Sequence, residues 1–379
     1  MIAPGSTLGV LGGGQLGRMF AMAAHRLGYR VAVLDPDSDC PAGGVANIHI
    51  CAPLDDERAW QRLADECAAV TIETESVPAE AVQFLAARMP VAPGAAALSI
   101  AQDRAREKHF LAANGFAVAP FRVIANAADV EDVDALLPGL LKVSRFGYDG
   151  KGQRAVRSSQ ELSHAVRQLG GVCVLEQRIE LAAELSVILA RSADGETAVY
   201  PVSLNHHTSG ILDLSMVPAP LPQAVCDRAV AESLRLAELL DYCGVLCVEF
   251  FLTPEGQLLV NEIAPRPHNS GHFTLDACYT SQFEQQVRVL AGMPLGDPAL
   301  LSPQKGVAMA NLLGQIWADG EPLWEEALST PNARLHLYGK KTPRTGRKMG
   351  HLTCIAESVT LAQTLVSGIR SVLQPQPSR

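Results

Sequence analysis

The feature that most constrains the fold of this chain is a predicted β-hairpin around residue 255. Residues 245–252 (VLCVEFFL) and 258–263 (LLVNEI) are rich in β-branched, aromatic and leucine side chains. They are separated by Thr253-Pro254-Glu255-Gly256, which is typical turn chemistry. We therefore predict that the two segments form neighbouring antiparallel strands.

This hairpin brings two carboxylates together. A turn centred between Glu255 and Gly256 places Glu249 directly opposite Glu262. Opposed side chains in a sheet have Cβ atoms roughly 4.5–5.5 Å apart, and like charges at that distance destabilise the pair. A divalent cation would compensate, and carboxylates beside Asn261 suit magnesium, which completes its shell with water and substrate phosphates. The alternatives are two glutamates on a solvated face or a hairpin in another register.

The loop after the hairpin, residues 264–272 (APRPHNSGH), carries polar groups and little that could build a core. Arg266 offers a planar fork for a carboxylate, phosphate or bicarbonate, and His268 and Asn269 add hydrogen-bonding groups nearby. We predict that this loop holds a small oxyanion beside a metal-bound phosphate. A purely structural role for a single histidine is the alternative.

Length and charge restrict the function. A chain of 379 residues suggests two or three domains, and its net charge of −9 argues against a general binder of nucleic acid or acidic membranes. The sequence shows neither a signal peptide nor about 20 uninterrupted apolar residues, so we expect a cytoplasmic protein with small-molecule partners. Nine cysteines without a CxxC pair predict buried thiols rather than a zinc site.

The N-terminus predicts a strand, a glycine turn and a helix. Residues 8–11 form the strand, residues 12–17 (GGGQLG) the turn, and residues 18–27 the helix. The glycines match G-x-G-x-x-G, and Asp35 ends the next predicted strand, where an NAD-binding protein has its ribose-binding acid. An NAD-binding oxidoreductase is therefore one hypothesis.

The first hundred residues alternate between strand and helix patterns, which predicts an α/β fold with an N-terminal doubly wound parallel sheet. Further strands are expected at 46–50 and 69–72, and helices at 55–66, 79–87 and about 98–113.

A second unit follows, with strands expected at 140–143, 172–175, 184–190 and 197–203, and helices at 223–240 and 282–290. The segment 142–153 (KVSRFGYDGKGQ) combines three glycines with three cations, which favours a phosphate-binding loop, although it lacks the Walker pattern and a solvated loop is the alternative.

The last segment of the chain contains a basic turn. Twelve positions hold six basic residues, which indicates an anion site in an acidic protein, with a solvated turn as the alternative. These residues are Lys340, Lys341, Arg344, Arg347, Lys348 and His351.

Together the motifs GGGQLGRM, TIETESVP, AQDR, GYDGKGQ, the pair EQ, NEIAPRPHNSGH and LYGK…GRKMGH, in this order, resemble those of the 5-(carboxyamino)imidazole ribonucleotide synthases, ATP-grasp ligases of purine biosynthesis. The resemblance covers nearly the whole chain. It implies an N-terminal domain over residues 1–97, an ATP-grasp domain over 98–294 and a small C-terminal domain over 295–379. It also implies a homodimer.

The activity implied by the resemblance is carboxylation of 5-aminoimidazole ribonucleotide with ATP and bicarbonate, through carboxyphosphate, releasing ADP and phosphate. Glu249 and Glu262 would hold magnesium. The catalytic residues would be Arg266, His268, Asn269, Asp149 and Lys151. ATP would be bound by Arg104, Lys142, Gly147, Tyr148, Asp149, Gly150, Lys151, Gly152, Gln153, Glu176, Gln177, Arg178, Ile179, Glu184, His207, Asn261 and Glu262. The ribonucleotide would be bound by Gln15, Leu16, Glu73, Tyr148, Asp149, Lys340, Arg347 and Lys348.

Other functions fit parts of the sequence. A formate-using glycinamide ribonucleotide transformylase shares the grasp fold, the glycine loop and the basic turn, but RPHNSGH and GYDGKGQ favour the carboxylating enzymes. Biotin carboxylase is disfavoured because the chain is short and has no biotin-carrier segment. A non-catalytic nucleotide sensor is disfavoured by the pair Glu249 and Glu262.

Overall fold

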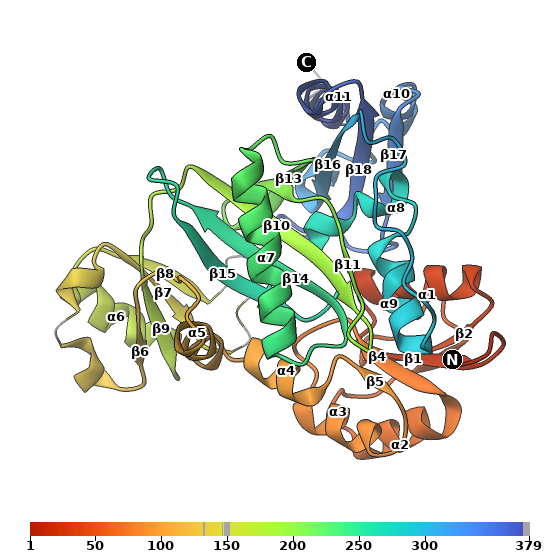
Figure 1. The fold of residues 1–379 in the computed structure, drawn as a ribbon, viewed down its shortest axis with the longest axis horizontal. Coiled ribbons are helices and arrows are strands. Elements are labelled where there is room, and N and C mark those ends of the chain that lie inside the picture. Colours follow the sequence, from red (N-terminus) through yellow and green to blue (C-terminus); the bar gives the residue numbers. More distant parts are fainter. Residues whose placement is uncertain (132, 146, 148–151, 374–379) are drawn as a thin grey trace.

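Three β-sheets organise the chain (Figure 1). The computed structural model describes residues 1–131, 133–145, 147 and 152–373. No helix in these residues is long and apolar enough to cross a membrane.

The N-terminal sheet is parallel, with strand order β3-β2-β1-β4-β5, which confirms the predicted doubly wound unit. Its reversal of strand order falls between β1 and β4, where ligands bind in open α/β sheets. The strands are β1 (Thr7–Leu11), β2 (Arg30–Leu34), β3 (Ile48–Ile50), β4 (Ala69–Ile72) and β5 (Val91–Ala92), and the helices are α1 (Gln15–Arg26), α2 (Glu57–Glu66), α3 (Ala79–Ala86) and α4 (Ala95–Ala101).

The helix predicted at 98–113 is wrong as a single element. α4 ends at Ala101, and α5 (Arg104–Ala113) begins after Asp103. The Asp103 carboxylate accepts hydrogen bonds from Ala105 N at 3.1 Å and Arg106 N at 3.3 Å. Asp103 therefore caps a new helix, which begins at Arg104.

A four-stranded antiparallel sheet follows, with order β6-β9-β7-β8. Figure 1 shows it on the far side of the central hairpin from the N-terminal sheet. Its elements are β6 (Phe121–Ile124), the short 3-10 helices η1 (Ala127–Val130) and η2 (Asp134–Leu136), β7 (Gly139–Val143), β8 (Gln153–Val156), α6 (Ser159–Leu169) and β9 (Cys173–Gln177).

The third sheet has nine strands, in the order β15-β14-β10-β12-β13-β16-β18-β17 with β11 added beside β10. The strand predicted at 197–203 is wrong as a single element, because Pro201 lacks the backbone N–H that a continuous ladder needs. The elements are β10 (Ala183–Arg191), β11 (Thr197–Val199), β12 (Ser203–Thr208), β13 (Ile211–Val217), α7 (Gln223–Leu239), β14 (Gly244–Leu252), β15 (Leu258–Ala264), η3 (Asn269–Gly271), α8 (Thr274–Ala277) and α9 (Gln282–Ala291).

The C-terminal strands continue this same sheet, since β16 pairs with β13. The predicted domain boundaries at 97/98 and 294/295 stay predictions. The last elements are β16 (Gly306–Leu313), η4 (Gly314–Trp317), α10 (Trp324–Leu328), β17 (Ala333–Leu337), β18 (Lys348–Ala356) and α11 (Val359–Val372).

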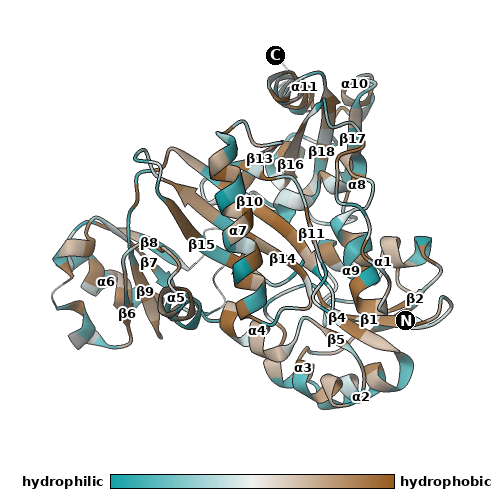
Figure 2. Ribbon diagram, viewed as in Figure 1, coloured by the Kyte–Doolittle hydropathy of each residue, from teal (hydrophilic) through white to brown (hydrophobic). Residues whose placement is uncertain are grey.

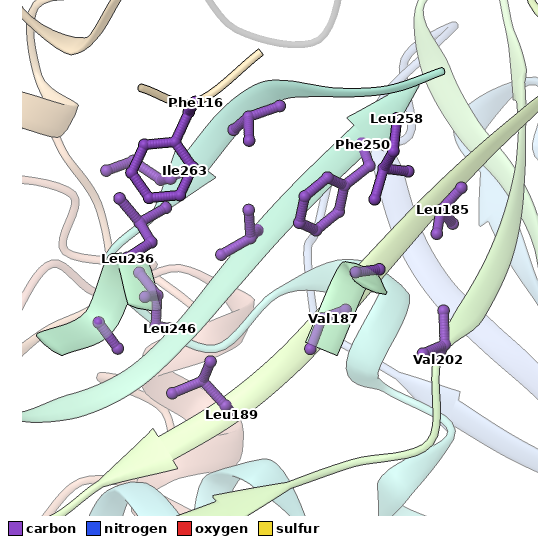
Figure 3. Packing of buried hydrophobic residues seen from close by; sticks show 14 of the residues in the cluster. Phe116, Leu185, Val187, Leu189, Val202, Leu236, Leu246, Phe250, Leu258 and Ile263 are labelled. Atoms are coloured by element: carbon purple, nitrogen blue, oxygen red, sulfur yellow. The ribbon is translucent and has the colours of Figure 1, made fainter. Parts of the chain in front are cut away.

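The hairpin of β14 and β15 lies between two clusters of buried apolar side chains, one on each face of the central sheet. Leu185, Val187 and Leu189 of β10 pack with Phe250 of β14 and Leu236 of α7 on one face (Figure 3). The alternate β10 residues belong to a second buried cluster on the opposite face. In Figure 2 hydrophobic colours accordingly run along β10 and β14. With both faces covered, the hairpin is a rigid support for polar side chains at its edge.

The prediction of buried thiols is confirmed for most cysteines but is wrong for Cys51, which is exposed, and Cys243, which is half-buried.

Candidate active site

A cavity of about 1010 Å³ lies between the N-terminal glycine loop, the four-stranded sheet and the hairpin. It brings together most of the predicted site residues, although they are spread over more than 300 positions of sequence. The predicted residues that line it are Gln15, Leu16, Glu73, Arg104, Lys142, Gly147, Gly152, Gln153, Arg178, Glu184, His207, Glu249, Asn261, Glu262, Arg266, His268, Asn269 and Lys348.

The structure does not include the remaining predicted site residues in this lining. Tyr148, Asp149, Gly150 and Lys151 lie outside the described residues. The cavity lining does not include Glu176, Gln177, Ile179, Lys340 or Arg347.

The predicted pairing of Glu249 with Glu262 is confirmed, but the turn differs from the prediction. Near the turn Phe250 pairs with Val260, so the loop is centred on Glu255. The register shifts between Phe250 and Glu249, which leaves Asn261 as the extra residue of a β-bulge. The bulge restores the register that opposes the two carboxylates.

Each of these carboxylates already has a basic side chain beside it. His268 Nε2 lies 3.0 Å from Glu249 Oε1, and Arg104 donates to Glu262 Oε2 at 3.1 Å. Burial opposes ionisation of Glu249, but His268, His207 and Lys348 outweigh it and hold the pKa of this carboxyl well below its ordinary value. Glu249 is therefore an anion at neutral pH.

The oxygens around this pair fit a hard cation. Asn261 Oδ1 is buried beside Glu262 and has no hydrogen-bond partner among the described residues. Two carboxylates and an amide oxygen form the type of ligand set that magnesium accepts. The residues present therefore fit the ion predicted from the sequence.

A buried charge network supports the floor of the cavity. Glu176 is nearly inaccessible and lies 3.0 Å from Lys142 Nζ, 3.4 Å from Lys108 Nζ and 4.0 Å from Arg104. Burial opposes the charge on Glu176, but these three cations lower its pKa. Glu176 thus orients the cations that face the cavity.

Two members of this network, Glu107 and Lys108, were missed at the sequence level. Lys108 Nζ donates to the Asn261 carbonyl at 2.9 Å, and Ile263 N donates to Glu107 Oε1 at 2.6 Å. Burial raises the pKa of Glu107 to about 8, even though Arg104 is close. The available signal was the spacing of residues 104, 107 and 108, which places three charges on one helix face.

The loop after the hairpin presents unpaired polar atoms to the cavity. Arg266 bonds Glu75 at 2.9 Å and the Pro267 carbonyl at 3.0 Å, yet its Nε is buried without a partner among the described residues. Both amide atoms of Asn269 are likewise buried and unpaired in the described part of the chain. Buried polar groups are normally satisfied, so these atoms indicate a small polar ligand.

Gln282, at the start of α9, fixes this loop from behind. Its side chain accepts from His268 N at 2.9 Å and donates to the His268 carbonyl at 2.7 Å. A Cβ at Gly271 would lie 2.6 Å from Gln282 Oε1, so glycine is required there. Gln282 therefore positions His268 without lining the cavity.

The opposite end of the cavity is formed by the glycine loop. Gly14 N and Gly17 N donate to the Glu73 carboxylate at 2.8 and 3.1 Å. This carboxylate occupies the helix N-terminus at which NAD-binding proteins hold a pyrophosphate. Asp35, the expected ribose-binding acid, instead accepts from Gly13 N at 2.6 Å. The glycine loop is thus closed by acids of the chain itself.

The basic turn reaches this end of the cavity. Lys340 Nζ donates to Gln15 Oε1 at 2.5 Å and to the Lys348 carbonyl at 2.7 Å. Lys348 lines the cavity, whereas Arg347 is half-exposed and donates to the Thr342 carbonyl at 2.9 Å. The basic turn therefore adds cations beside the glycine loop, and Lys340 and Lys348 make this end of the cavity the cationic wall.

The central strands add a carboxylate–imidazole pair to the cavity. Glu184 Oε2 lies 2.7 Å from His207 Nδ1. Burial lowers the basicity of His207, but Glu184 and Glu249 outweigh it and raise the pKa of this imidazole.

Three family descriptions match consecutive parts of the sequence: the ribonucleotide synthetase preATP-grasp domain over residues 5–102, the ATP-grasp domain over 109–283 and the phosphoribosylaminoimidazole carboxylase C-terminal domain over 307–364. The N5-carboxyaminoimidazole ribonucleotide synthase of Bacillus subtilis is 41% identical, covering 93% of this chain and 92% of its own. That of Brucella melitensis is 44% identical, covering 93% and 97%.

Solved structures give the same result. An ADP complex of N5-carboxyaminoimidazole ribonucleotide synthetase superposes with a TM-score of 0.91 at 39% identity and covers 99% of both chains. The synthase of Aspergillus clavatus in complex with ADP and 5-aminoimidazole ribonucleotide has a TM-score of 0.87 at 30% identity and covers 97% and 98%.

Proposed function

The chain belongs to the N5-carboxyaminoimidazole ribonucleotide synthases, ATP-grasp ligases that carboxylate 5-aminoimidazole ribonucleotide in purine biosynthesis, and from this premise we propose how its residues divide that reaction. The observation that carries the proposal is a single cavity with a charge-balanced network at one end and a cationic wall at the other. We assign the first end to ATP and the second to the ribonucleotide.

The base and ribose of ATP fit between the four-stranded sheet and the hairpin. Leu140, Leu181 and Phe251 line this part of the cavity and offer apolar walls to adenine. Glu184 would accept hydrogen bonds from the ribose hydroxyls. Glu176, which the resemblance implied as an ATP-binding residue, is engaged by three cations, so we propose that it acts through Lys142 and Arg104.

The phosphates would lie over Lys142, Arg104 and His207, with Gly147, Gly152 and Gln153 above them. We propose that Glu249, Glu262 and Asn261 hold magnesium here. When bound, the ion would neutralise charge on the nucleotide phosphates. Glu249 suits this role because it stays ionised in a buried site.

Bicarbonate fits the unpaired atoms of Arg266 and Asn269. We propose that a bicarbonate oxygen attacks the γ-phosphorus of ATP, the bond from that phosphorus to ADP breaks, and carboxyphosphate forms. The amine of the ribonucleotide then bonds to the carboxyl carbon, phosphate leaves and the amine loses a proton. Arg266, His268 and Asn269 contribute by positioning, which is the larger requirement for an anion that needs little activation.

The ribonucleotide would lie against Gln15, Leu16 and Glu73, with its 5′-phosphate toward Lys340, Arg347 and Lys348. Lys348 lines this end of the cavity, and Lys340 contacts Gln15, which also lines it. Roles for Tyr148, Asp149 and Lys151 stay predictions, as do a cytoplasmic location and a homodimer, which light scattering of the purified protein would test.

The experiment is ADP release from ATP and magnesium, with bicarbonate or formate, in the presence and absence of 5-aminoimidazole ribonucleotide. We expect release to require bicarbonate and to rise sharply with the ribonucleotide. Equal rates without the ribonucleotide, or a requirement for formate, would contradict the proposal.

A further inference from the structure

Three histidines and an aspartate form a second cluster, outside the cavity, where α8 meets β17 and β18. Asp276 Oδ2 lies 2.9 Å from His336 Nε2. His336 and His351 are direct partners across β17 and β18, and their rings stack with centroids 4.6 Å apart and an angle of 14°. His272 lies beside them, with its ring centroid 4.9 Å from that of His351. None of these four residues lines the cavity.

Two imidazole nitrogens in the cluster are buried without a partner among the described residues: His351 Nε2 and His272 Nε2. Both side chains are fully buried. Buried polar atoms in proteins are nearly always satisfied, so two unpartnered nitrogens on rings whose centroids are 4.9 Å apart indicate a missing ligand.

The hydrogen bonds of the cluster define which nitrogens are available. Gln282 Nε2 donates to the His268 carbonyl at 2.7 Å and lies 3.2 Å from His272 Nδ1, to which it donates its second proton. Neutral His272 therefore carries its own proton on Nε2 and is a donor there. His351 Nδ1 lies 2.9 Å from the Tyr338 hydroxyl, and the tautomer of His351 that donates this hydrogen bond keeps a lone pair on the unpaired Nε2.

We propose that Asp276, His336 and His351 bind a divalent transition-metal ion of the zinc class. One ligand atom from each residue lies within 4.8 Å of the others, so small side-chain movements would close them around an ion. Two imidazoles and a carboxylate suit zinc or cobalt, whereas magnesium prefers oxygen ligands alone. Tyr338 orients His351 as outer-shell partners orient metal-binding histidines. His272 Nε2–H would donate to a water on the ion.

Access from solvent is consistent with this site. His336 retains 29% of its side-chain exposure and so offers a route for the ion from solvent. The ion would link β17 and β18 to α8, and would so connect the C-terminal strands to the segment that follows the loop of residues 264–272.

A competing site must be separated from this one. Cys247, Glu249 and His268 also place ligand atoms within 4.8 Å of one another, and Glu249 and His268 line the cavity. Zinc titrations are therefore needed on three variants besides the wild type: His336→Gln, which can still bond Asp276; Glu249→Gln, which disables the competing site; and His206→Gln, which changes an exposed histidine of β12.

The test uses the full chain, freed of metal with a chelator, and titrated with zinc alone by calorimetry. Cobalt is the spectroscopic probe, and crystals soaked in zinc give the position by anomalous scattering. We expect one tight site that survives Glu249→Gln and His206→Gln. His336→Gln should weaken it by at least about 100-fold, since even outer-shell partners contribute about 10–100-fold.

Thermal melting with chelator keeps the result interpretable. Wild type and His336→Gln should melt alike without metal, and zinc should raise the Tm of the wild type and of Glu249→Gln but not of His336→Gln. A conservative second variant, Asp276→Asn, should match His336→Gln. Zinc affinity unchanged in both variants, an anomalous peak only at Cys247, Glu249 and His268, or no binding at all would overturn the proposal.

Discussion

The two ends of the cavity are built on different electrostatic plans. At the nucleotide end Lys108 is buried and Arg104 and Lys142 are largely covered, and all three pair with Glu176 or Glu262 at 3.0–4.0 Å. At the ribonucleotide end the groups are more exposed, and Lys340 and Arg347 bond backbone carbonyls. The first end is a coupled network and the second a set of separate contacts.

This difference predicts how far the effect of a substitution should extend through the site. Removing one member of a buried network leaves a partner uncompensated in a medium of low dielectric, so the whole group responds. Removing a cation that bonds a backbone carbonyl should change mainly the contact between that side chain and the bound substrate. The following substitutions test this difference between the two ends.

The largest effect is expected for Glu262→Gln. It removes a charge from the proposed magnesium site, so kcat should fall on the order of a thousandfold, which is typical of losing one group that stabilises transition-state charge. The Glu262 side chain is 39% exposed, so loss of its pair with Arg104 should change the free energy of unfolding by less than about 1 kcal/mol. Steady-state kinetics at several magnesium concentrations and thermal melting measure the two quantities.

This result would also correct an expectation drawn from the sequence. Two facing glutamates alone would predict that Glu262→Gln stabilises the metal-free protein by relieving repulsion. Arg104 and His268 already compensate the two charges, so little relief remains. Wild-type turnover at low magnesium, or an unfolded variant, would show that the pair has a structural role.

The next effect is expected for Gln282→Glu. The new carboxylate cannot donate to the His268 carbonyl, so the loop of residues 264–272 should no longer be held in place. We therefore expect kcat to fall about 10–100-fold, with little change in the KM for ATP. Protonation restores the donor, so activity relative to wild type should recover as pH falls. Kinetics as a function of pH measure this signature.

Gln285 supplies a matched control. It holds Gly296 in the same way, accepting from its N–H at 2.9 Å and donating to its carbonyl at 2.7 Å, but Gly296 does not line the cavity, whereas His268 does. Gln285→Glu should therefore leave kcat nearly unchanged. Equal losses in both variants would mean that stability, and not the position of His268, explains the effect.

A smaller effect is expected for Arg347→Ala. Losing one charge-assisted hydrogen bond of about 1.5–3 kcal/mol should raise the KM for the ribonucleotide about tenfold to a hundredfold and leave the KM for ATP unchanged. Arg344→Ala, in the exposed part of the same turn, is the control. Separate titrations of the two substrates decide it. Equal weakening of both would break the comparison, and weakening of ATP alone would reverse the assignment of the two ends.

Local chemistry explains which parts of the site were predictable. The turn at residues 253–256 and the alternation around it predicted that Glu249 faces Glu262, and the order of motifs predicted the fold class. The bulge at Asn261 was not predictable, because the Asn261 carbonyl accepts a hydrogen bond from Lys108 of α5, 153 positions earlier. The same holds for Glu107, whose backbone partner Ile263 is 156 positions away.

The errors in the predicted elements have local causes that the sequence contains, but the patterns of the neighbouring residues outweighed them in the prediction. Asp103 is a strong helix cap, yet the helical spacing on both sides of it favoured one continuous helix. Pro201 likewise interrupts a run of strand-forming residues. Gln282 appeared only as the first residue of a helix, because its role depends on the return of the chain to His268.

The smallest effect concerns the pH dependence of stability at the nucleotide end. Burial raises the pKa of Glu107 from 4.5 to about 8 in the folded protein. Between these values the folded state binds a proton that the unfolded state lacks. The associated stability is therefore fully present below the lower value and is lost as pH rises through the upper one.

Glu107→Gln should remove this loss. The variant keeps an acceptor for Ile263 N, so we expect its free energy of unfolding to be flatter than that of the wild type across this window, by on the order of 1 kcal/mol. Urea unfolding at a series of pH values measures the slope, and Glu80→Gln on the surface of α3 is the control. Parallel curves for wild type and Glu107→Gln would mean that Glu107 is ionised and paired with Arg104 at neutral pH. The coupled network would then extend one residue deeper than the distances around Glu176 indicate, and Glu107 would balance the cations of the nucleotide end as a charge and not as a neutral hydrogen-bonding group.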